Sequence, residues 1–187
     1  QRQMCIRDST SFNPGSGKSF LAMNIAMSFA IKKKRILVID GDLRHGSTSS
    51  YVDSPKTGLS DYLGNRVSDW KEIIVKDEKY DNLHIIPIGT VPPNPTELLE
   101  DGKLATLIEV LRSEYDYIFI DCPPIDIVAD AQIIEKLADR TVFVVRSGLL
   151  DRSMLPELEN IYQEKRFKNL SVILNGTESA GGRYGYR

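Results

Sequence analysis

A short glycine-rich segment, Asn-Pro-Gly-Ser-Gly-Lys-Ser at residues 13–19, constrains this chain more than any other feature. It runs directly into residues 19–31, whose apolar side chains recur at helical spacing. Glycines let backbone N–H groups face inward, and the helix start adds its positive end, so the segment favours a bound phosphate. Lys18 then reaches the β- and γ-phosphates, and Ser19 ligates Mg²⁺. The general pattern has glycine where this chain has Phe12, and a plain tight turn is the alternative.

Short apolar runs alternate with helical patterns along the rest of the chain, which predicts a parallel sheet with helices on both faces. Pro95, directly after Asn94, predicts the first turn of a further helix. The expected fold class is α/β, a three-layer P-loop NTPase fold with a mostly parallel central sheet flanked by helices. The expected strands are residues 36–39, 83–88, 117–120, 141–145 and 171–174, and the expected helices are residues 19–31, 103–111, 126–137 and 151–163.

Three aspartates follow two of the expected strands directly. Asp40 and Asp42 come after residues 36–39, and Asp121 comes after residues 117–120. Parallel sheets bind ligands at the carboxyl ends of their strands, where carboxylates hold Mg²⁺ or accept a proton from a hydroxyl nucleophile. The alternative is that these aspartates only cap turns. Together with the glycine-rich segment, they predict one magnesium and phosphate centre suited to phosphoryl transfer.

The charge balance excludes a general attraction to polyanions. The chain has 24 basic and 26 acidic residues, a formal net charge of −2, so no overall field draws it to nucleic acid or to an anionic membrane. The basic run at residues 32–35 lies where a helix is expected to end, and cations there suit the helix dipole. No nucleic-acid partner is expected, and no catalytic role is assigned to His45 or His84.

The expected domain organisation has three parts. Residues 1–9 are interpreted as an irregular leader that need not be native sequence, because Arg7 and Asp8 interrupt the strand pattern that should precede the glycine-rich segment. Residues 10–176 are expected to form a single P-loop domain that contains the phosphate site. Residues 177–187 are interpreted as a flexible tail rich in glycine and tyrosine, because this composition has too little apolar surface to offset the entropy of ordering.

These motifs, together with Asp-Cys-Pro-Pro at residues 121–124 and Asn-Pro-Thr-Glu-Leu-Leu at residues 94–99, resemble the bacterial tyrosine kinases of capsule and exopolysaccharide synthesis. The resemblance covers about residues 10–187. It implies a non-specific protein-tyrosine kinase that uses ATP and Mg²⁺ and autophosphorylates. It also accounts for Phe12, since that family tolerates residues other than glycine there.

The resemblance assigns a role to each matching residue. Catalytic roles fall to Lys18, Asp40, Asp42 and Asp121, and the choice of base between Asp40 and Asp42 stays open. Magnesium is expected at Ser19, Asp42 and Asp121. Nucleotide contacts are expected from Pro14, Gly15, Ser16, Gly17, Lys18, Ser19, Phe20 and Asn175. For Asn175, which would read the adenine edge as in related nucleotide-binding proteins, a simple turn with Gly176 is the alternative.

The same family commonly ends in a tyrosine-rich tail, which makes Tyr184 and Tyr186 the expected phosphoacceptors. The resemblance further implies a membrane-spanning activator or a fused transmembrane domain, self-association of the full-length protein, and work in the cytoplasm at the inner face of the bacterial plasma membrane.

Two other functions remain open at this point. Partitioning and septum-placement ATPases have a similar fold and act as P-loop switches that control assembly, but they use a signature lysine where this chain has Asn13. A module that binds nucleotide without turning it over is the third possibility. The complete set of Lys18, Ser19 and the three aspartates argues against it.

Overall fold

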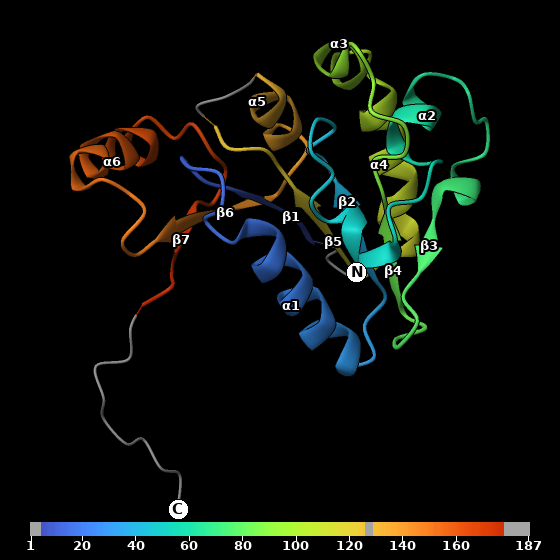
Figure 1. Ribbon diagram of the computed structural model, residues 1–187, viewed down its shortest axis with the longest axis horizontal. Coiled ribbons are helices and arrows are strands. Elements are labelled where there is room, and N and C mark those ends of the chain that lie inside the picture. The colour runs from blue at the N-terminus through green and yellow to red at the C-terminus, as the bar shows by residue number, and fades with distance from the viewer. Residues whose placement is uncertain (1–4, 126–128, 178–187) are drawn as a thin grey trace, which may run out of the picture.

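The computed structural model describes residues 5–125 and 129–177 and places a seven-stranded sheet at the centre of the fold (Figure 1). The strands lie in the order β3-β4-β2-β5-β1-β6-β7, and every neighbouring pair is parallel except β3 and β4. The mostly parallel α/β sheet is confirmed. The strands are β1 (Cys5–Thr10), β2 (Ile36–Asp40), β3 (Val75–Lys76), β4 (Leu83–Ile86), β5 (Tyr117–Asp121), β6 (Arg140–Arg146) and β7 (Ser171–Asn175).

Helices cover both faces of this sheet. One face carries α1, and the opposite face carries α2 to α5, while α6 lies beside β6 and β7 (Figure 1). The α-helices are α1 (Lys18–Ile31), α2 (Leu59–Leu63), α3 (Pro95–Glu100), α4 (Lys103–Glu114), α5 (Asp130–Glu135) and α6 (Leu155–Gln163), with 3₁₀ turns η1 (Ser49–Val52), η2 (Trp70–Ile73) and η3 (Arg152–Met154).

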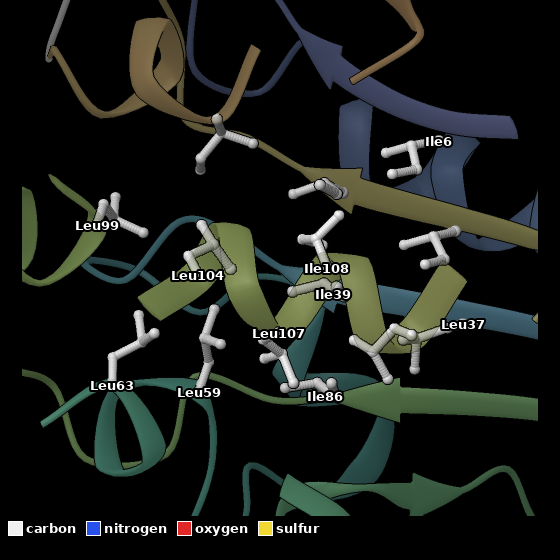
Figure 2. Packing of buried hydrophobic residues seen from close by; sticks show 14 of the residues in the cluster. Ile6, Leu37, Ile39, Leu59, Leu63, Ile86, Leu99, Leu104, Leu107 and Ile108 are labelled. Atoms are coloured by element: carbon white, nitrogen blue, oxygen red, sulfur yellow. The ribbon is translucent and has the colours of Figure 1, made fainter. Parts of the chain in front are cut away.

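Strand β2 shows why its sequence is apolar at successive positions. Ile36 and Val38 pack on the α1 side, whereas Leu37 and Ile39 belong to the cluster formed with α4. Successive side chains of a strand point to opposite faces, so a strand between two helical layers must be apolar on both. Figure 2 shows Leu37 and Ile39 in the cluster on the α4 side, with Ile39 near Ile108 of α4.

The strand register brings distant residues to one edge of the sheet. Asp40 at the end of β2 pairs with Asp121 at the end of β5, and Ser9 of β1 pairs with the same Asp121. At the end of β6, Arg146 pairs with Asn175 of β7. Because these strands are parallel, their carboxyl ends share one edge, and that edge also receives the loop that joins β1 to α1.

The structure corrects several expected boundaries. Residues 5–9 belong to β1 in the middle of the sheet, so the irregular leader is wrong for this part of residues 1–9; parallel pairing with β5 and β6 overrides the polar interruption. The helix expected at residues 126–137 is described only over Asp130–Glu135. The helix expected from Pro95 is confirmed, although the Asn94 amide donates to Glu97 instead of capping the backbone with its oxygen.

Asp8 places a carboxyl group in the buried interior beside strand β1. Its side chain is 1 % exposed, and neither carboxylate oxygen has a partner in good hydrogen-bond geometry among the described residues, although the nearby Thr141 hydroxyl acts to lower the pKa of Asp8. Burial raises the pKa of Asp8 to about 7, from an ordinary value of 3.8. The folded state therefore holds a proton that the unfolded state releases, and stability falls as the pH rises from the ordinary pKa through about 7.

We expect Asp8→Val to stabilise the fold at pH 8 by about 2–4 kcal/mol, because it removes an unpaired buried carboxylate from a strand. Urea unfolding of both proteins at pH 5 and pH 8 measures the effect. The stability gap should widen toward pH 8, since only the wild type must ionise a buried group. An equal gap at both pH values would contradict this account, and Asp8→Asn separates the charge from the polarity.

Candidate functional site

The glycine-rich loop has the backbone geometry that its sequence predicts. Gly15 and Gly17 have φ angles of 73° and 93°, in the left-handed region that favours glycine. Gly17 is the N-cap of α1, a helix of 14 residues, so the free N–H groups and the positive end of that helix face the loop. A loop of this form binds phosphate oxygens through its backbone.

Three side chains hold the loop, one from within it and two from the ends of neighbouring strands. Ser16 donates its hydroxyl to the Asn13 carbonyl at 2.8 Å. Arg146 donates to the Gly15 carbonyl at 2.7 Å, and the Asn175 amide donates to the next carbonyl, that of Ser16, at 2.9 Å. The ends of β6 and β7 therefore fix two consecutive peptide groups of the loop.

Phe12 explains why the loop begins without glycine. Its ring is 3 % exposed and packs edge-on against Phe143 of β6, with the ring centroids 4.9 Å apart. An aromatic anchor at this position ties the start of the loop to the core.

Lys18 is buried at the start of α1, with 9 % of its surface exposed. Burial lowers its pKa, while the charges of Asp121 and Asp42 act in the opposite direction. In the part of the chain that the structure describes, no hydrogen bond or ion pair occupies its ammonium group. A buried cation with free donors is a strong site for an anion.

Asp121 lies beside this lysine and is held by hydroxyl groups. Thr48 donates to one carboxylate oxygen at 2.6 Å and Ser9 donates to the other at 3.3 Å. Burial raises the pKa of Asp121, and hydrogen bonding from Ser19 and Thr48 and the charge of Lys18 oppose this rise. The contact with Ser19 links the carboxylate to the first turn of α1.

Asp40 is fully buried one strand away. One carboxylate oxygen accepts from the backbone N–H and the hydroxyl of Ser49, each at 2.7 Å, and the other has no partner among the described residues. Burial raises the pKa of Asp40 to about 7, and the charges of Asp121 and Asp42 add to the rise. A half-satisfied buried carboxylate is poised to accept a proton or a ligand.

Asp42 completes the group at the mouth of the site. It is 7 % exposed and accepts from the backbone N–H of Arg44 at 3.2 Å, while the His45 ring nitrogen lies 3.1 Å from its carboxylate. Between the two acids, Gly41 donates its N–H to the Asp121 carbonyl at 2.8 Å, where an added Cβ would come within 3.0 Å of that oxygen. This close approach disfavours a larger residue at position 41.

The arrangement suits a magnesium ion that is completed by phosphate and water. Among the described residues, no cluster of three or more His, Cys, Asp or Glu side chains is placed to hold a metal by itself. Mg²⁺ ordinarily binds one or two carboxylates and keeps substrate phosphates and waters in its shell. The contact between Ser19 and Asp121, with Asp42 nearby, fits that mode.

The remaining predicted residues lie in different settings. Pro14 is exposed on the loop, and Phe20 is 58 % exposed on α1. Asn175 packs against Gly17 and supports the loop backbone, a contact that the sequence did not reveal. Tyr184 and Tyr186 lie outside the described residues.

Sequence reasoning missed Thr48 and Ser49, which hold the two buried carboxylates. Their only signal was a run of hydroxyl residues at positions 47–50, and such a run is usual in any polar loop. Their role depends on a fold that returns this loop to the ends of β2 and β5.

Comparison with known proteins identifies relatives along nearly the whole chain. The AAA domain family matches residues 10–147. The tyrosine-protein kinase CpsD of Streptococcus pneumoniae is 35% identical over 178 residues, which is 94% of this chain and 78% of CpsD.

Solved structures agree. The kinase domain of the Escherichia coli tyrosine kinase ETK superposes with a TM-score of 0.85 at 31% identity, covering 98% of this chain and 72% of that one. The chimerical protein CapA2B2 gives 0.83 at 32% identity, covering 92% and 76%. MinD of Pyrococcus horikoshii complexed with Mg-ADP gives 0.75 at 22% identity, covering 92% and 70%, and shows a shared fold alone.

We expect Gly17→Ala to destabilise the protein by about 1–3 kcal/mol more than Gly102→Ala does. Both glycines begin helices with positive φ, so the backbone strain is matched. Only at position 17 would the new Cβ meet a side chain, the Asn175 amide at 2.3 Å, whereas Gly102 has nothing within 4 Å. Thermal unfolding measures the difference. Asn175→Ala should recover part of the loss in the Gly17→Ala background, and equal losses for the two glycines would refute the close contact.

Proposed function

This chain belongs to the AAA-domain tyrosine-protein kinases of capsule and exopolysaccharide systems, and from that membership we propose that it transfers the γ-phosphate of ATP to tyrosines of its own tail. The observation that carries the proposal is the meeting of Lys18 with Asp40, Asp42 and Asp121 at the mouth of one phosphate loop. A buried ammonium and carboxylates around one phosphate loop suit phosphoryl transfer, which depends on positioning and on electrostatic stabilisation of the transferred group.

The phosphate loop and Lys18 bind the triphosphate. Backbone N–H groups at Gly15 to Ser19 contact phosphate oxygens, and the Lys18 ammonium contacts the β- and γ-phosphates, where charge develops during transfer. Burial strengthens this interaction because few water molecules screen it. Pro14, Phe20 and Asn175 flank the nucleotide in this proposal, and the Asn175 amide also donates to the Ser16 carbonyl of the loop.

The carboxylates divide into metal ligands and a base. Ser19, Asp42 and Asp121 would hold Mg²⁺, which neutralises charge on the β- and γ-phosphates when bound. The tyrosine oxygen forms a bond to the γ-phosphorus, the bond from that phosphorus to the β,γ-bridging oxygen breaks, and ADP leaves. The tyrosine proton passes to Asp40 or Asp42, and the choice between them stays open.

The tail supplies the acceptors in this proposal. Tyr184 and Tyr186 follow Gly181 and Gly182 in the sequence, and in this proposal their hydroxyl groups enter the site of another copy. The P-loop fold shared with a Mg-ADP complex supports nucleotide as the ligand, and ATP with Mg²⁺ is the finer proposal.

We place the protein in the cytoplasm, at the inner face of the plasma membrane. Its proposed partner is a membrane-spanning activator or a fused transmembrane domain, and the full-length protein is proposed to self-associate. The relation to the chimerical protein CapA2B2 and to the tyrosine-protein kinases supports a partner of this kind. Within the described residues, no helix has the length and apolar character needed to cross a bilayer.

The test uses γ-labelled ATP and Mg²⁺ and compares labelled tyrosine with released phosphate. We expect labelled tyrosine in the wild type, with the activator's cytoplasmic segment added where needed, and a loss of roughly 10²–10³-fold in Lys18→Met, because the developing charge loses its buried cation. Lys71→Met, an exposed lysine beside Trp70, is the matched control and should retain activity.

The double variant Tyr184→Phe/Tyr186→Phe tests the acceptors. It should lose most of the label while nucleotide binding stays intact, since neither residue belongs to the phosphate loop. Label that persists at other tyrosines would redirect the acceptor assignment. Free phosphate without phosphotyrosine in the wild type would favour an ATPase switch of the partitioning type instead.

A further inference from the structure

A second concave site lies at the edge of the sheet opposite the phosphate loop. It is a surface cavity of about 710 Å³ lined by Arg140, Tyr162, Gln163, Lys165, Phe167, Lys168, Asn169 and Leu170. Arg140 begins β6 and Leu170 precedes β7, whereas the phosphate loop lies at the far ends of these two strands. The volume falls within the roughly 300–1,000 Å³ range of small-ligand sites.

The lining has a consistent charge. Three of its side chains are cationic and none is a carboxylate. Lys168 donates to the Lys136 carbonyl at 2.9 Å, which orients one bond and leaves its other donors available. In the described ranges, neither Arg140 nor Lys165 has a hydrogen bond or ion pair from its side chain. The charge of Glu135 acts on Lys168 from beside the cavity, but the lining itself keeps an excess of positive charge, which attracts a compact anion.

The backbone at the end of α6 fixes the position of Lys165. Lys165 has a φ angle of 53°, the left-handed conformation that ends α6, and Asn169 has a φ angle of 47°. The Lys165 N–H donates to the Tyr162 carbonyl at 3.1 Å, and the Arg166 N–H donates to the Ile161 carbonyl at 3.1 Å, which completes a Schellman-type cap. Lysine is costly at this position, where glycine is usual, and its presence puts a charge at the rim of the cavity.

Aromatic rings accompany the charges. Tyr162 is 59 % exposed, whereas Phe167 is nearly buried in the cluster that joins α6 to β6. A cavity that combines an exposed ring with an arginine and two lysines matches an aryl phosphate, because the ring packs on the ligand's ring while the guanidinium takes two phosphate oxygens. An extended polyanion needs a long basic track, and the chain's net charge of −2 provides no wider field.

We propose that this cavity, the rear basic pocket, binds a phosphotyrosine side chain presented by another polypeptide. The inference rests on the proposed function for the source of its ligand, since the reaction at the phosphate loop makes this group. Because the two sites occupy opposite edges of the sheet, a bound phosphotyrosine lies away from the nucleotide. The rear basic pocket thus binds the product of the reaction at a place other than the one where it is formed.

The experiment measures binding of a labelled peptide to the full chain by fluorescence anisotropy, without ATP. The peptide has the sequence of residues 181–187 with phosphate on both tyrosines, and the receiving protein is Tyr184→Phe/Tyr186→Phe, so that its own tail does not compete. We expect the unphosphorylated peptide to bind at least about tenfold more weakly. We also expect Arg140→Ala/Lys165→Ala to weaken the phosphopeptide by at least about tenfold, the factor that corresponds to one charge-assisted hydrogen bond.

A matched pair removes two cations elsewhere. Lys71→Ala/Lys79→Ala changes the net charge equally at exposed lysines beside Trp70 and Tyr80 and should bind like the parent. Thermal unfolding confirms that both double variants fold. Equal binding of the two peptides, or equal losses in the two double variants, would overturn the proposal. So would inorganic phosphate or anionic phospholipid vesicles that compete with the peptide as effectively as free phosphotyrosine does.

The outcome is separable from that of the kinase proposal. Lys18→Met should bind the phosphopeptide like the parent, because Lys18 lies at the opposite edge of the sheet. Loss of binding in that variant would contradict a separate site. If the wild type labels no tyrosine but the phosphopeptide still binds, the proposed activity is refuted and the proposal for the rear basic pocket stands.

Discussion

The structure depends on the cost of burying charge at the carboxyl edge of a parallel sheet. Lys18, Asp40 and Asp121 are almost fully removed from water, and burial is the largest influence on the pKa of each. Such charges persist only where opposite charges and hydrogen bonds offset the lost hydration. For Lys18 the charges of Asp121 and Asp42 provide part of that compensation, and for the two carboxylates hydrogen bonds from neighbouring hydroxyl groups do so, with the charge of Lys18 acting on Asp121 as well.

Hydroxyl groups determine how the buried carboxylates are held. Thr48 bonds Asp121, and Ser49 bonds Asp40 and also accepts from the Ile88 N–H at 2.9 Å. One short loop after β2 therefore joins Asp40 and Asp121 to the segment that follows β4. Because these hydrogen bonds favour the charged form of each carboxylate, they oppose the effect of burial and keep the acids available for metal or proton.

The two ends of the sheet have different chemistry. At the carboxyl end, Arg146 and Asn175 use their donors on carbonyl groups of the phosphate loop, so they support an existing site. At the amino end of the same strands, the cations of the rear basic pocket remain available for a ligand. Strands β6 and β7 thus connect a site that makes an aryl phosphate with a site that fits one.

The sequence by itself determined the α/β class, most of the strands, the glycine-rich loop and the three aspartates, because strand periodicity and glycine spacing are local properties. It misjudged residues 5–9, whose polar pattern is overridden by pairing with β5 and β6. Only the tertiary structure decided that Thr48 holds Asp121, that Asn175 packs on Gly17, and that a basic hollow forms behind α6. These contacts join residues that lie far apart in the chain. The cost of burying a charged group depends on everything that surrounds the group in the fold, and a local sequence pattern does not contain this information.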